Sequence, residues 1–143
     1  MVSETKISDD LEEKRKEELK ELLRKEEELR KEEERKEELR KEHEKRKLED
    51  QIKEMKGKIN ELRDKIRSTK VSNDPKQDND LKQEPLKKLD EAEGYLKSAE
   101  EQIKSNNIKD GIGYIDNAQR SIDAASHWLS RFQNKDQSLG MGI

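Results

Sequence analysis

The feature that most constrains this chain is its charged segment, residues 12–47, where 30 of 36 residues are Glu, Lys or Arg. All three residue types favour the α-helix. Seven Glu residues stand four positions before a Lys or Arg, as in Glu12–Lys16 and Glu42–Arg46, which is the stabilising orientation. Asp9 or Asp10 can cap the helix start. We therefore predict a disordered stretch over residues 1–8 and one long charged helix over residues 9–67.

This charged segment resembles the ER/K type of single α-helix, a family of stable monomeric helices that act as spacers. The resemblance implies a spacer on the order of 55 Å long, at 1.5 Å per residue. The segment departs from the family in one respect, because Leu19, Leu22, Leu23 and Leu29 form a short apolar stripe. We expect some lateral packing at this stripe.

The second half of the predicted helix carries a heptad seam over residues 48–66. Apolar residues follow one another at spacings of 4, 3, 4, 3 and 4, at Leu48, Ile52, Met55, Ile59, Leu62 and Ile66. Isoleucine at every a position with Leu or Met at d favours a parallel coiled-coil dimer. Because the seam is shorter than three heptads, it could equally pack on the C-terminal hairpin or on another protein.

A polar, turn-rich stretch over residues 68–83, with Pro75 after Asp74, predicts a flexible linker. A hairpin of two antiparallel helices should follow, over about residues 84–105 and 108–133, with a flexible tail at 134–143. Pro85 suits the first turn of its first helix. Asn106 and Asn107 should form the tight turn between the two helices. The fold class is thus all-α, a long charged helix with a coiled coil joined to a helical hairpin.

The second hairpin helix carries more apolar surface than one partner helix can cover. An isoleucine stripe and an aromatic flank make up this surface, and we predict from them an interface formed by Ile108, Ile112, Ile115, Leu129, Tyr114, Trp128 and Phe132. Three coverings are open: a second copy giving a four-helix bundle, the chain's own seam giving a three-helix arrangement, or a different protein.

Two weaker resemblances involve the hairpin. Residues 106–119 resemble the turn and second helix of a tetratricopeptide repeat, but a single unit cannot form the stacked array that this family uses. Arg120 and His127, seven residues apart on one helix, are similar to the catalytic motif of HEPN ribonucleases, which implies a dimeric helical nuclease as a remote alternative.

Composition narrows the function. Net charge is only −3, from 33 basic and 36 acidic residues, so there is no basic excess for nucleic-acid or membrane binding. Neither a metal-ligand cluster nor a nucleophile–base set can be assembled, and cysteine is absent, which points to the cytoplasm. We therefore expect a non-enzymatic interaction protein (a scaffold, assembly factor or regulatory subunit) without cofactor, metal or small-molecule ligand. Its partner should be another protein or a second copy of the chain, and for self-association we favour a dimer. The alternative function is a viral- or phage-type assembly scaffold.

Overall fold

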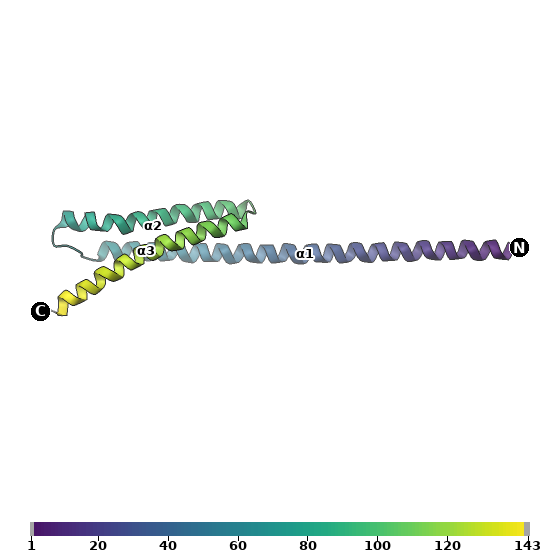
Figure 1. Ribbon diagram of the computed structural model, residues 1–143, viewed down its shortest axis with the longest axis horizontal. Helices are drawn as coiled ribbons and strands as arrows, with labels where there is room; N and C mark the ends of the chain where they lie inside the picture. The colour runs from purple at the N-terminus through teal and green to yellow at the C-terminus, as the bar shows by residue number, and fades with distance from the viewer. Residues whose placement is uncertain (1, 142–143) are drawn as a thin grey trace. The chain divides into compact units, whose positions relative to one another are not determined.

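Three helices form the described part of the chain, which confirms the predicted all-α class. The computed structural model describes the backbone of residues 2–141 and the side chains of residues 8–133. Helix α1 spans Val2–Ser68, α2 spans Pro75–Lys104 and α3 spans Ile108–Met141, with no strand in the described part (Figure 1). The chain divides into two units, Met1–Glu44 and Lys45–Ile143, so that α1 contributes to both.

The Met1–Glu44 unit is a single charged helix. Intrahelical ion pairs join Lys31 to Glu27 at 3.7 Å and Lys36 to Glu32 at 3.9 Å, as the Glu-before-Lys spacing predicts. The helix begins at Val2 rather than at residue 9, where the sequence predicted its start. Residues 2–8 contain neither Gly nor Pro, so nothing in them breaks a helix that the charged run continues.

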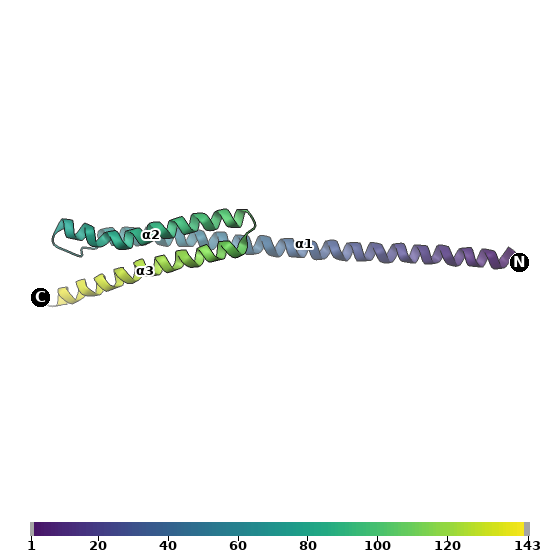
Figure 2. The ribbon, with the colours of Figure 1, turned by 45° about the horizontal axis from the view of Figure 1, so that its top comes forward.

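The Lys45–Ile143 unit, called the bundle below, packs the C-terminal part of α1 against α2 and α3 (Figures 1 and 2). One buried cluster contains residues of all three helices, among them Ile59 of α1, Leu96 of α2 and Ile122 of α3, each fully buried. This is the three-helix arrangement that the sequence left open as one of three coverings. In the described side chains no buried polar atom lacks a hydrogen-bond partner.

The connection between α1 and α2 is much shorter than the predicted linker over residues 68–83. Helix α2 already begins at Pro75, with Asp74 as its N-cap accepting a hydrogen bond from the backbone N–H of Lys76 at 3.2 Å. The sequence reading placed this start at the second proline, Pro85, which in fact lies buried inside α2. The prediction failed because Asp-Pro is a helix-start signal as well as a turn signal.

The turn between α2 and α3 forms where it was predicted. Asn106 adopts the left-handed conformation, with φ of 64°. The backbone N–H of Asn107 donates to the carbonyl oxygen of Gln102 at 2.8 Å. The backbone N–H of Asn106 donates to the carbonyl oxygen of Ile103 at 3.1 Å. This pair of bonds is the Schellman motif that closes a helix C-terminus. Helix α3 then continues to Met141, through most of the stretch predicted as a flexible tail at 134–143.

Candidate interaction surfaces

The predicted seam on α1 is buried inside the chain. Its five members from Ile52 onward belong to the core and are at most 7% exposed, while Leu48 packs on the edge of this core. The heptad spacing therefore identified the right residues. Their cover is the α2–α3 hairpin of the same chain, which occupies the face that a dimer would use.

The predicted apolar flank on α3 is largely covered as well. Ile115, Leu129 and Trp128 belong to the core, and Trp128 lies against Phe132 with ring centroids 4.4 Å apart. Tyr114 stacks on Tyr95 of α2, with centroids 6.5 Å apart.

The two remaining members of the predicted interface lie at the start of α3. Ile108 is half-buried against the core, whereas Ile112 is 43% exposed. Among the seven residues named from the sequence, only Ile112 is classed as exposed. The intramolecular covering thus accounts for most of the surplus apolar surface.

Ion pairs fasten α1 to α2 along the edge of the core. Arg63 is mostly buried and donates to Asp90 at 2.6 Å and to Glu93. The hydrogen bond from the Arg63 guanidinium lowers the pKa of Glu93, and the two carboxylates raise the pKa of Arg63. A further pair joins Lys56 to Glu100. These contacts orient the two helices relative to each other.

A second polar cluster holds the connection between α1 and α2. The Lys82 ammonium, 7% exposed, donates to the carbonyl of Arg67 at 3.0 Å and contacts Asp78 at 2.8 Å. Asp78 in turn accepts from the backbone N–H groups of Val71 at 2.8 Å and Ser72 at 3.2 Å. The bond from Lys82 and these backbone bonds lower the pKa of the Asp78 carboxyl. The cluster caps the end of α1 and fixes the connecting loop.

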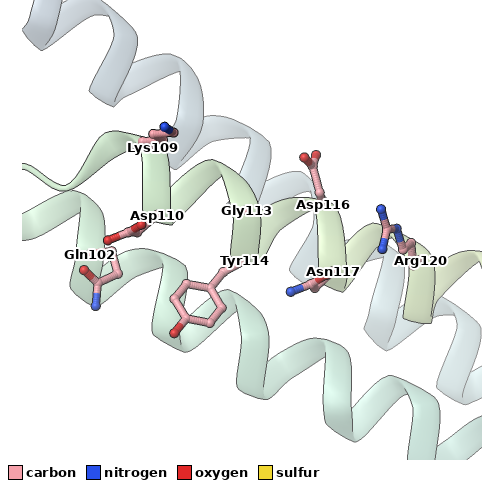
Figure 3. A pocket seen from close by; sticks show the side chains of 8 residues that line it. All are labelled: Gln102, Lys109, Asp110, Gly113, Tyr114, Asp116, Asn117 and Arg120. Atoms are coloured by element: carbon pink, nitrogen blue, oxygen red, sulfur yellow. The ribbon is translucent and has the colours of Figure 1, made fainter.

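One open depression, about 630 Å³ in volume, lies at the start of α3 beside the end of α2 (Figure 3). Charged residues of both signs line it, with Lys109 and Arg120 near Asp110 and Asp116, and Tyr114 points toward α2. Arg120, one half of the HEPN-like pair, is exposed here. His127 is also exposed, but it is not among the lining residues. The depression offers hydrogen bonds to solvent but no deeply buried charged group.

Among the described side chains, the most exposed large apolar residues lie elsewhere, on the Met1–Glu44 unit. Six leucines there are between 51% and 65% exposed: Leu11, Leu19, Leu22, Leu23, Leu29 and Leu39. At 100° per residue the first five fall within an arc of about 120° on one side of the helix. We call these five residues the leucine arc. The sequence marks four of them as an apolar stripe but does not identify them as a site. The predicted interface was placed on α3 instead, because that helix carries the aromatic residues.

Two absences among the described residues bear on the kind of site. No helix there is both long and apolar enough to cross a membrane. No group of three or more His, Asp or Glu side chains is placed to hold a metal ion in the described part of the chain.

Comparison with known proteins finds no family model that matches the chain, and no match among curated proteins or solved structures.

Proposed function

We propose that this chain is a non-enzymatic protein-interaction module that meets its partner through the charged helix of the Met1–Glu44 unit. The observation that carries the proposal is the exposure of the leucine arc, whose members are 51–60% exposed. A scaffold, an assembly factor and a regulatory subunit are all roles that such a module can serve.

The leucine arc has the form of a helical docking face. Leu19, Leu22 and Leu29 recur at spacings of three and seven residues, which brings them to one side of the helix. Apart from the leucines, nearly all residues of this stretch are Glu, Lys or Arg. Leucine adds little to helix propensity over Lys or Glu, so a solvated spacer gains nothing from these residues. Contiguous exposed apolar side chains with a polar rim are typical of a protein interface, and helix-in-groove or helix-to-helix docking uses this spacing.

The bundle supports this assignment because its own candidate docking faces are buried inside it. The seam of α1 and the apolar face of α3, which the sequence offered as docking faces, contact one another in the core. Among the described side chains, six of the seven exposed large apolar residues lie on the charged helix, and the seventh is Ile112 of α3.

The proposal is tested by comparing three full-length proteins in affinity purification from the native host and in light scattering. The first is the natural chain, the second carries Leu22→Lys with Leu29→Lys, and the third is the matched control Glu28→Lys on the opposite side of the helix. We expect a partner, or a second copy, to associate with the natural chain and the control but not with the leucine variant. Equal association of all three proteins, or association with none, would overturn the proposal.

A further inference from the structure

We infer that the partner of the leucine arc is a second copy of this chain, paired antiparallel about residue 24. The inference rests on the proposed function and names the occupant of the same surface. It depends on a symmetry in the positions of the exposed leucines and on the charges that lie between them.

A heptad frame shows which side chains would meet. With Leu19 at position a and Leu22 at position d, the frame extends in both directions along the helix. Its a positions then hold Glu12, Leu19, Glu26 and Glu33, and its d positions hold Arg15, Leu22, Leu29 and Lys36. In an antiparallel pair each a residue packs in a layer with a d residue of the partner, so one register fixes every layer.

In the register where the two residue numbers add to 48, six of the eight layers are complementary. Leu19 packs on the partner's Leu29, and Leu22 packs beside the partner's Glu26. Outside these layers Arg15 faces the partner's Glu33.

At the ends of the frame Glu12 faces the partner's Lys36. The leucine layers are therefore flanked on both sides by layers of opposite charge. No layer of the frame brings two like charges together.

The other exposed leucines obey the same symmetry. At the e positions Leu23 lies beside its own copy across the two-fold axis. At the g positions Leu11 lies beside the partner's Leu39. Five of the six exposed leucines therefore meet a leucine. A nearly palindromic apolar pattern is what an isologous two-fold interface requires, since each patch must be complementary to itself.

A parallel pair in the same frame is disfavoured. It would place each residue against its own copy, which stacks like charges at Glu26 and Glu33 as well as at Arg15. Like charges directly opposed destabilise a helix pair, and polar residues in a and d layers specify orientation. The charge pattern thus selects the antiparallel pair over the parallel one.

The layers of this register all lie within the Met1–Glu44 unit. The outermost layers hold Glu12 and Lys36, so the pairing ends before the bundle begins at Lys45. The register has three costs. Glu26 shares a layer with the partner's Leu22 and has no opposite charge there. At the solvated flanks Lys25 lies beside its own copy and Glu18 beside the partner's Glu32. We therefore expect a weak, reversible dimer that a covalent trap can capture.

Disulfide trapping tests the register directly, because the natural chain contains no cysteine. Single variants Leu19→Cys and Leu29→Cys, one carrying a mass tag, are mixed and mildly oxidised. We expect the mixed disulfide to form, since a disulfide needs Cα atoms within roughly 7 Å. Each variant alone should cross-link poorly, because two copies of residue 19 would be about 15 Å apart along the axis.

Two further single variants complete the experiment. Leu23→Cys should cross-link with itself, and the outward-facing control Glu28→Cys should not. A parallel pair would give the opposite pattern for Leu19→Cys, with efficient cross-linking of the variant to itself. That result, or equal cross-linking at all positions, would overturn the inference.

Charge reversal provides an independent measurement. Arg15→Glu and Glu33→Arg should each weaken dimerisation roughly fivefold, because each creates two like-charge layers. The double variant restores opposite charges in both layers and should return to the natural affinity, measured by sedimentation equilibrium. Failure of the double variant to recover would contradict the proposed register.

The failure of this inference can be told apart from failure of the proposed function. If no cross-link forms while the Leu22→Lys with Leu29→Lys variant still loses a foreign partner, the self-pairing is wrong and the docking role of the arc stands. If the chain neither cross-links nor binds anything through the arc, both are wrong.

Discussion

Gly111 shows how a single residue sets the distance between two helices. A methyl group placed on its Cα would lie 2.8 Å from Cγ1 of Ile103 and 3.5 Å from the carbonyl oxygen of Ala99. The start of α3 therefore approaches the end of α2 more closely than a larger residue would allow. Gly113, two residues later on the same helix, has open space at the same position.

Two alanine substitutions should separate packing from helix propensity. Gly113→Ala should stabilise the bundle by about 0.5–1 kcal/mol, because alanine loses less backbone entropy in a helix than glycine. Gly111→Ala gains the same propensity but must displace the buried Ile103 side chain, so we expect a net loss of about 1–2 kcal/mol. Chemical denaturation followed by circular dichroism measures both. A stabilising Gly111→Ala would show that the two helices separate at little cost.

Asp78 makes the connection between α1 and α2 sensitive to acid. Its folded pKa lies below the ordinary value of 3.8, so its bonds to Lys82 and the loop contribute stability above that pH. This contribution is lost as the pH falls through the lowered folded pKa. We expect Asp78→Asn to destabilise the protein at neutral pH and to differ less from the natural chain as the pH drops below about 3.8. Thermal unfolding across this range measures the difference, and a gap that stays constant would contradict it.

At the scale of elements, the sequence predicted which faces are buried better than it predicted what covers them. The spacing of Ile52, Ile59 and Ile66 identified a buried stripe, and all three are at most 2% exposed. The same spacing suits a dimer seam and an intramolecular seam equally, because both bury one side of a helix. Asn106 and Asn107 predicted the turn correctly because few residues other than glycine tolerate the left-handed conformation.

The predictions that failed concern helix ends, and local spacing could not show what covers the aromatic flank of α3. Pro85 was placed at a helix start, whereas Pro75 supplies it and Asp74 caps it. The aromatic flank of α3 looked uncovered because Tyr114 has its stacking partner, Tyr95, on the other helix of the hairpin. Such long-range contacts leave no mark in local periodicity.

An element-scale prediction follows from the intramolecular seam. Ile59→Ala removes a fully buried side chain and should cost about 2–5 kcal/mol of stability, whereas Leu22→Ala in the exposed arc should change bundle stability by less than about 0.5 kcal/mol. The melting temperature of the bundle should not depend on protein concentration. A midpoint that rises with concentration would indicate that the seam is shared between chains.

At the scale of the whole molecule, two units of different character share one chain. The bundle has a closed apolar core, whereas the Met1–Glu44 unit is stabilised by its own backbone and by exposed ion pairs, which each contribute little. Local opening should therefore cost far less free energy in the charged helix than in the bundle.

Limited proteolysis checks this difference, since Lys and Arg occur throughout both units. At low protein concentration trypsin should remove the charged helix first and leave a resistant fragment that begins near Arg46 or Lys47. At high concentration, antiparallel pairing should slow cleavage in the charged helix. Cleavage that begins within α2 would contradict the division into two units.

The Lys82 ammonium has a chemical consequence beyond the stability of the loop. An acylating reagent reaches an amine only where solvent does, and Lys82 is 7% exposed while its ammonium donates to the carbonyl of Arg67 and to Asp78. Most other lysines in the described part of the chain are exposed. Acylation of Lys82, detected by mass spectrometry, should therefore report each opening of the connection between α1 and α2.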